Sequence, residues 1–222
     1  MNNSELMVTL FIGAVLMCVL LSYQMKWYGL AIWKSIVISI ALVITGLIGS
    51  RIWYYVENGT FRGRSFYGAI FLAPVVFFSV SKIIKIQYGH SLDFCATAGC
   101  LALSLVKIQC LRDGCCDGMV LYLDANYNYV KFPSQIVEMI AFLVIGTILF
   151  LVSSKEKNRG KIFPLFLCLY GASRFVLNFF RDGIEPYALG LSAGSFWSLI
   201  SFVAGCLILT RGKCKVVQKR GV

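Results

Sequence analysis

Residues 133–153 read PSQIVEMIAFLVIGTILFLVS and carry a single charge, at Glu138. A helix needs about 20 apolar residues to cross a hydrocarbon core ~30 Å thick, and within lipid a helix satisfies its own backbone hydrogen bonds. The run therefore predicts a membrane-spanning helix. Six further apolar stretches of similar length lie at residues 5–25, 35–56, 67–86, 93–111, 162–181 and 193–210. With 59% hydrophobic residues and a mean hydropathy of +0.78, they predict an all-α polytopic membrane protein with seven transmembrane helices.

The basic residues predict the orientation of these spans. The start, MNNSEL, has no basic residue, so we expect no cleaved signal and a retained first span. Basic side chains in loops favour the cytoplasmic side, which places the N-terminus outside and the C-terminus inside. The argument rests on 13 of the 21 basic residues, which occupy alternate connections and the tail: Lys26, Lys34, Lys82, Lys85, Lys155, Lys157, Arg159, Lys161, Arg211, Lys213, Lys215, Lys219 and Arg220.

This topology predicts one seven-helix membrane domain over residues 1–211 and a basic cytoplasmic tail over residues 212–222. We expect a multi-pass protein of the inner (plasma) membrane. The formal charge of +11 then reflects topology and attraction to membrane lipids, and it does not indicate nucleic-acid binding.

Eight basic residues do not fit the positive-inside pattern, because they fall at outer span ends or in outer loops. A basic residue costs about 2.5–3.5 kcal/mol at the centre of a span, and less near its end. One interpretation is that each side chain reaches outer-leaflet phosphates. The other is an outward-facing cationic pocket for a phosphate or carboxylate, formed by Arg51, Arg174 and Arg181. The eight are Arg51, Arg62, Arg64, Lys107, Arg112, Lys131, Arg174 and Arg181.

Acidic residues and the single histidine offer few catalytic candidates. Glu138 lies in the first turns of the fifth predicted span, and an internal salt bridge to an arginine is favoured over direct catalysis. Asp93 opens the fourth span, where it fits a helix cap as well as a site residue. His90 precedes it on the predicted inner side, so an interfacial role is favoured over that of a general base in an outer pocket.

Residues 110–118, CLRDGCCDG, hold the densest polar chemistry of the chain. Zinc is disfavoured because Cys110, Cys115 and Cys116 lack paired C-x-x-C spacing, and nothing fixes a disulfide pairing among the nine cysteines. We expect no metal and no cofactor. Gly114 and Gly118 allow a tight turn out of the fourth span, with free backbone N–H groups and close approach of an anion or ester.

Blocks of sequence in order along the chain resemble the bacterial prolipoprotein diacylglyceryl transferases. The block over residues 106–118, VKIQCLRDGCCDG, is similar to the family's Gly-Arg-Ile-Gly-(Asn/Cys)-Phe run and the glycines after it. The block YGASRFVLNFFR resembles Tyr-Gly-x-x-Arg-Phe-x-x-Glu-Phe-Phe-Arg. The further blocks are GSRIWYYVENG (49–59), SLDF (91–94), FPSQIVE (132–138) and LSAGSFWSL (191–199).

The resemblance implies an enzyme that moves the diacylglyceryl group of phosphatidylglycerol to the thiol of a lipobox cysteine in a preprolipoprotein. Guanidinium groups would neutralise the departing phosphate, and a cationic pocket would favour the thiolate. The implied catalytic residues are Arg174, Lys107, Tyr170 and Tyr67. Those implied to bind substrate are Arg51, Cys110, Gly114, Gly118, Gln135, Glu138 and Arg181.

The chain departs from the family pattern at three polar positions. Lys107 stands where the family carries its central arginine, which keeps the charge but loses the planar fork of donors. Tyr67 replaces a histidine and Asn178 replaces a glutamate. An alternative is therefore a paralogue with the same fold and headgroup pocket that serves another acceptor, or a non-catalytic lipid-binding protein. A transporter is less favoured, since the charges cluster at one face.

Overall fold

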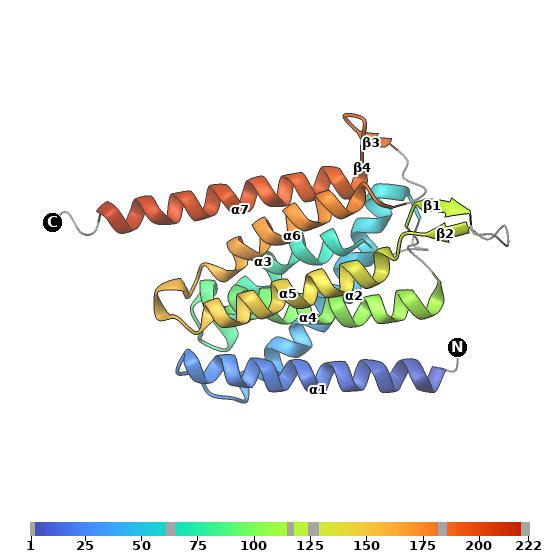
Figure 1. Ribbon diagram of the computed structural model, residues 1–222. Coiled ribbons are helices and arrows are strands. Elements are labelled where there is room, and N and C mark those ends of the chain that lie inside the picture. The colour runs from blue at the N-terminus through green and yellow to red at the C-terminus, as the bar shows by residue number, and fades with distance from the viewer. Residues whose placement is uncertain (1–2, 61–64, 115–117, 124–128, 182–185, 219–222) are drawn as a thin grey trace. The chain divides into compact units, whose positions relative to one another are not determined.

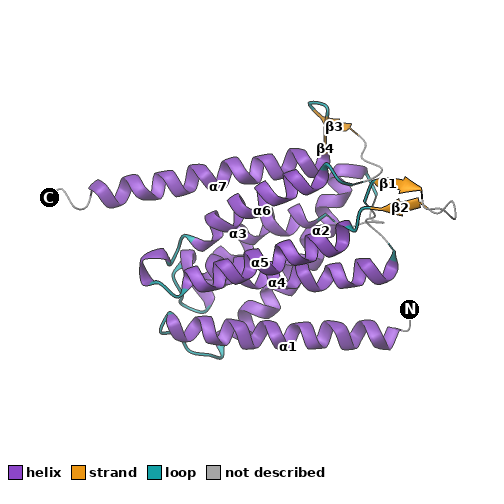
Figure 2. Ribbon diagram, in the orientation of Figure 1, coloured by secondary structure: helices purple, strands orange, loops and turns teal. Residues whose placement is uncertain are grey.

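The computed structural model describes residues 3–60, 65–114, 118–123, 129–181 and 186–218, and it is mostly helical, at 78%. Figure 1 labels the elements and Figure 2 distinguishes helices from the short strands. The strands form two antiparallel hairpins, β1 (Val120–Leu123) with β2 (Tyr129–Lys131) and β3 (Pro186–Ala188) with β4 (Leu191–Ser192). The α-helices are α1 (Asn3–Trp27), α2 (Lys34–Asn58), α3 (Phe66–Ile83), α4 (Tyr88–Asp113), α5 (Ser134–Ser153), α6 (Ile162–Asn178) and α7 (Ala193–Gln218).

Each helix coincides with one of the predicted apolar stretches, so the helical content of the predicted fold is confirmed. Five helices are long and apolar enough to cross a membrane: Lys34–Asn58, Phe66–Ile83, Tyr88–Arg112, Ser134–Ser153 and Ala193–Arg211. Shorter apolar helices cover Val15–Trp27 and Ile162–Asn178. By length and composition, the described residues therefore contain five candidate spans.

The exposed and buried residues of helix α2 are distributed as expected for a helix in lipid. Its exposed side carries large aliphatic residues one turn apart, at Ile40, Ile44 and Ile48, whereas its buried residues include Ser39 and Thr45. A helix at a water-facing surface would show the opposite distribution. Small residues at the buried positions let neighbouring helices approach closely, as they do in membrane bundles.

The chain divides into two compact units. Unit 1 contains residues Met1–Ala102 and Ile148–Phe163, and unit 2 contains Leu103–Thr147 and Pro164–Val222. Unit 1 thus holds α1 to α3, most of α4 and the connection between α5 and α6. Unit 2 holds the end of α4, most of α5 and α6, both hairpins and α7.

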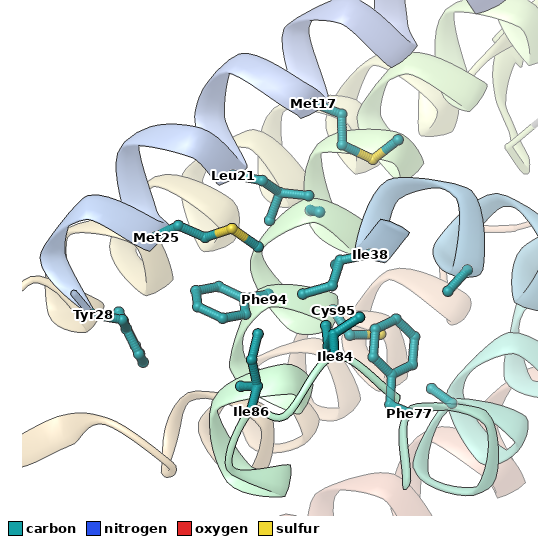
Figure 3. Close-up of a cluster of buried hydrophobic side chains, with 13 residues drawn as sticks. Met17, Leu21, Met25, Tyr28, Ile38, Phe77, Ile84, Ile86, Phe94 and Cys95 are labelled. Carbon is teal, nitrogen blue, oxygen red and sulfur yellow. The ribbon is translucent and has the colours of Figure 1, made fainter. Parts of the chain in front are cut away.

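The core of unit 1 is a cluster of apolar side chains from four helices (Figure 3). Leu21 and Met25 of α1 meet Ile38 of α2, Phe77 of α3 and Phe94 of α4 in this cluster, and all five are almost fully buried. Burial of a large apolar side chain from water contributes about 1.5–3 kcal/mol, whereas in lipid the close packing itself supplies the stabilisation. The cluster fixes these four helices against one another.

Helices α2 and α3 cross at a pair of glycines in unit 1. A Cβ on Gly49 would lie 2.7 Å from the carbonyl oxygen of Gly68, and a Cβ on Gly68 would lie even closer to that of Gly49. The Ser65 N–H also donates to the Ser50 carbonyl at 2.9 Å. Only glycine permits this approach. As a result, α2, which carries Arg51, touches α3, which carries Tyr67.

Three connections with basic residues meet at one end of unit 1, around the buried carboxylate of Asp93. The Ile162 and Phe163 N–H groups, at the start of α6, donate to Asp93 Oδ1 at 2.9 and 3.3 Å. The Gly160 N–H and the Tyr28 hydroxyl donate to Oδ2, the latter at 3.0 Å. The connections α1–α2, α3–α4 and α5–α6 therefore share one end of this unit, as the charge pattern predicts.

Asp93 is a helix cap, but of a different helix from the one that the sequence indicates. Helix α4 begins at Tyr88, so Asp93 lies inside it, and its carboxylate satisfies the first N–H groups of α6. Burial, together with Asp93, raises the pKa of the Tyr28 phenol, so the hydroxyl stays protonated and donates to the carboxylate. His90 lies edge-on to the Tyr28 ring, with centroids 4.8 Å apart.

Candidate functional site: a cationic cluster in unit 2

Three charged side chains from three helices meet inside unit 2. The carboxylate of Glu138 on α5 forms ion pairs with Arg174 of α6 through Oε1 and with Lys107 of α4 through Oε2. The Glu138 side chain is 1% exposed, and those of Lys107 and Arg174 are 11% and 13% exposed. The predicted internal salt bridge of Glu138 is confirmed, and Lys107 is a second partner beside the expected arginine.

The cluster carries a net positive charge, since two cations share one carboxylate. The charge of Arg181 adds to the positive potential at Glu138. A charge away from water is costly unless it is paired, so Glu138 stabilises both cations, and the three side chains together carry one net positive charge. Such a site attracts an anion, and a phosphate monoester or diester is a natural ligand for a guanidinium.

The cluster lies close to the helix ends that join the hairpins of unit 2. Glu138 is four residues from the start of α5, Arg174 four residues from the end of α6, and Lys107 six residues from the end of α4. At 1.5 Å per residue, these positions lie about 6–9 Å inside the respective ends. The three residues lie at similar distances from their helix ends, so their side chains can meet although they are far apart in the sequence.

Tyr170 and Gln135 lie on the same helices as the ion pairs, one turn away. Tyr170 precedes Arg174 by four residues, so both side chains lie on one face of α6. Its ring is buried and lies against Phe142 and Phe166, with centroids 5.7 and 5.4 Å away. Gln135 precedes Glu138 by three residues on α5 and is also buried.

The segment that follows α4 packs against the end of α6. Gly118 forms a bridge with Arg181, and the Met119 N–H donates to the Phe180 carbonyl at 2.9 Å. A Cβ on Gly118 would lie 2.2 Å from the Phe132 carbonyl oxygen, so a larger residue would displace this contact. The chain itself therefore packs closely against Gly118, and the approach of a ligand to this glycine stays a prediction.

Gly114 ends α4 in the left-handed conformation, with φ +63°, as the predicted tight turn requires. Cys110, one turn earlier, is half-buried. Cys115 and Cys116 lie outside the described residues, as do Arg62 and Arg64. Within the described ranges, no group of three or more His, Cys, Asp or Glu side chains is arranged to hold a metal ion.

Asn178, noted in the sequence only as a departure from the family pattern, orders the start of α7. Its amide nitrogen donates to the hydroxyls of Ser192 and Ser195, the latter at 2.8 Å. Ser192 in turn accepts the Ser195 N–H at 3.1 Å as an N-cap. A serine directly before an apolar helix and another three residues later was the available signal for this cap.

Unit 1 contains the two remaining predicted site residues, Arg51 on α2 and Tyr67 on α3. Arg51 is exposed and Tyr67 is buried, on either side of the glycine crossing. The structure thus brings Lys107, Glu138 and Arg174 into one cluster, with Tyr170, Gln135 and Arg181 on the same helices or at their ends. Arg51 and Tyr67 lie on two neighbouring helices of the other unit.

The fold and the cluster are those of a mostly helical protein with candidate membrane spans and a buried cluster of two cations and one carboxylate. The family model described as prolipoprotein diacylglyceryl transferase matches residues 7–211. The chain therefore belongs to the prolipoprotein diacylglyceryl transferase family, as the sequence blocks predict.

Curated relatives carry the same name. A protein of Clostridium perfringens named phosphatidylglycerol–prolipoprotein diacylglyceryl transferase 2 is 26% identical over 82% of this chain and 80% of its own length. The transferase of Geobacter sulfurreducens is 32% identical over 67% of this chain and 60% of its own. That of Dehalococcoides mccartyi strain BAV1 is 28% identical over 63% of this chain, and the match spans 57% of the relative.

Proposed function

We propose that this protein transfers the diacylglyceryl group of phosphatidylglycerol to the thiol of a lipobox cysteine in preprolipoproteins. The observation that carries the proposal is the buried cluster in which Lys107 and Arg174 share the single carboxylate of Glu138. Family membership and the names of the relatives supply the substrate class.

The reaction replaces a carbon–oxygen bond by a carbon–sulfur bond. The thiolate attacks the glyceryl carbon that carries the phosphate ester, the C–O bond breaks, and its electron pair leaves with glycerol phosphate. The proton of the thiol leaves with the phosphate, so atoms and charge balance. The negative charge that develops on the departing phosphate requires fixed positive groups, which in a low-dielectric site stabilise it far more than they would in water.

Arg174 and Lys107 are the proposed groups that stabilise this phosphate. Glu138 contacts Arg174 through one terminal nitrogen and thereby fixes the guanidinium, whose planar fork of donors suits a phosphate. Tyr170, one turn earlier on the same face, is proposed to position the headgroup or the thiol. Arg181 adds positive potential near the end of α6.

The remaining assignments are proposed from the family resemblance, separately for each unit. Arg51 and Tyr67 of unit 1 would contact the headgroup, with Tyr67 in the place of the family's histidine. Gln135 and Cys110 would bind substrate beside the cluster, and Gly114 and Gly118 would shape the backbone around it. We propose no metal and no cofactor.

The same proposal includes the topology. Seven spans, with the N-terminus outside and the C-terminus inside, would make residues 1–211 one membrane domain and residues 212–222 a cytoplasmic tail. The cluster would then lie toward the outer leaflet of the inner membrane. The meeting of three basic connections at one end of unit 1 supports this arrangement.

A second candidate is a paralogue that binds the phospholipid headgroup but serves another acceptor. Lys107 favours it, because an ammonium engaged with Glu138 provides no planar fork where the family carries an arginine. The experiment that separates the two candidates supplies the gene to cells depleted of their own transferase. Restored lipidation of lipoproteins supports the transferase, and stable expression without lipidation supports the paralogue.

A further inference from the structure

A groove of about 380 Å³ lies between the end of α1 and the start of α2, within unit 1. It is separate from every residue assigned to the transfer reaction. Ser22, Tyr23 and Lys26 line it from α1, and Trp33, Ser35 and Ile36 line it from the α1–α2 connection and α2. The groove is thus an apolar channel with hydroxyl groups in its wall and a basic side chain beside it.

The charged side chain that lines this groove, Lys26, is cationic, and Lys34 lies beside it over the ring of the lining residue Trp33. Lys26 lies over the Tyr23 ring at 5.3 Å from the centroid, and Lys34 lies over the Trp33 ring at 5.9 Å. Within the described ranges of the chain, neither lysine has an acidic partner. Each ammonium is therefore held at the groove by an aromatic face, with its charge available to an external anion.

The aromatic residues indicate the depth at which the groove lies in a membrane. Tyr23 and Trp33 are each more than half exposed, beside exposed aliphatic residues such as Val19 and Ile36. Tyrosine and tryptophan favour the level of the lipid headgroups, with their polar atoms toward water and their rings toward the acyl chains. The two lysines then stand at phosphate level, and the groove runs below them toward the hydrocarbon.

The wall of the groove carries hydroxyl groups in a region that faces lipid. Ser22 and Ser35, one from each helix, are within 3.1 Å of each other, and the Ser22 hydroxyl donates to the Cys18 carbonyl at 2.7 Å. Because the Ser22 hydroxyl donates to Cys18, Ser35 donates to Ser22, and the pair can accept a further hydrogen bond, such as one from a headgroup hydroxyl. An apolar molecule without such groups would leave this capacity unused.

We propose that the α1–α2 groove binds one anionic phospholipid of the inner leaflet. Its phosphate lies at Lys26 and Lys34, a headgroup hydroxyl donates to Ser22, and an acyl chain lies along Val19 and Ile36. Charge complementarity selects an anionic over a zwitterionic headgroup, because each lysine near the surface favours an anionic lipid by about fivefold. The site is a docking site for intact lipid, distinct from the proposed reaction site in unit 2.

Native mass spectrometry of the purified full chain tests the proposal by counting bound lipids during titration with phosphatidylglycerol and, separately, phosphatidylcholine. The test variant is Lys26→Gln/Lys34→Gln. The matched control is Lys82→Gln/Lys85→Gln, which removes two basic residues of unit 1 that lie outside the groove, with Lys82 also over an aromatic ring. Thermal unfolding of both variants checks that each is folded.

We expect the test variant to bind one phosphatidylglycerol fewer, or to bind that lipid about 25-fold more weakly, with phosphatidylcholine binding unchanged. The control should change neither. An Arg174→Ala variant should keep the groove-bound lipid, so failure of the proposed transferase function would leave this result intact. Equal loss of both lipids, equal loss in the control, or affinity for phosphatidylglycerol within twofold of the unmodified protein would overturn the proposal.

Discussion

Glu138 of α5 and Arg174 of α6 form a buried ion pair, and Lys107 of α4 contacts the other oxygen of the same carboxylate. The pair ties two helices together and also fixes a guanidinium in the interior of unit 2. The effects of the pair on stability and on reaction can be separated by substitution, because the carboxylate has two partners and removal of one cation leaves the other pair in place.

Removal of the shared carboxylate should destabilise the protein strongly. Glu138→Ala leaves Lys107 and Arg174 side by side in the interior without their counterion, and a broken buried pair costs about 3–5 kcal/mol. We expect low folded yield and a clear drop in the thermal midpoint of the detergent-purified protein. The control is Glu156→Ala, which removes an 87% exposed carboxylate paired with Arg159 and should change the midpoint little. Equal midpoints for the two variants would contradict a buried role for Glu138.

Removal of Arg174 should reduce turnover and spare the fold. In Arg174→Ala, Glu138 keeps Lys107 as its partner, so unit 2 retains a neutral pair. The departing phosphate then lacks a positive contact, which typically costs about 10²–10³ in rate. Membrane levels and transfer rate should be measured together. A well-folded Arg174→Ala protein with full activity would remove Arg174 from the mechanism.

Lys107→Arg should preserve the fold and maintain or raise activity. Arginine keeps the ion pair with Glu138 and adds the planar donors that the family carries at this position. Comparison of the transfer rates of the two purified proteins checks this. Activity lost on this change, with the thermal midpoint intact, would favour the paralogue with a reshaped pocket.

Asp93→Ala should destabilise unit 1 without touching the cationic cluster. The substitution leaves the first N–H groups of α6 and the Tyr28 hydroxyl without their acceptor, and loss of a cap alone costs about 0.5–2 kcal/mol. Because several buried donors are affected, we expect the thermal midpoint to fall by more than in Tyr28→Phe, which removes one of them. A smaller fall in Asp93→Ala than in Tyr28→Phe would show that the cap is not the main role of Asp93.

The proposed orientation can be tested at the connection between α5 and α6. A single reporter cysteine at Asn158 in a cysteine-free background should resist a membrane-impermeant thiol reagent applied to intact cells, and react once the cells are opened. Labelling in intact cells would reverse the proposed topology.

The helices could be predicted from the sequence because each coincides with a long apolar stretch, and length and hydropathy are local properties. The partners of polar side chains could not. Asp93 caps the helix that begins at Ile162, and Gly118 packs closely against Phe132. Both contacts depend on how distant segments of the chain pack. The pairing of Glu138 with an arginine was predictable from the shortage of acidic residues, whereas its sharing with Lys107 required three helices in register.

Direct assay of the transfer reaction tests the proposed function most directly. The purified protein is mixed with phosphatidylglycerol and a synthetic lipobox peptide, and the mass of the peptide is followed, with a peptide in which serine replaces the lipobox cysteine as the control. We predict a mass increase equal to one diacylglyceryl group on the cysteine peptide alone, with release of one glycerol phosphate. Folded protein that binds phosphatidylglycerol but leaves the cysteine peptide unmodified would contradict the assignment as a diacylglyceryl transferase.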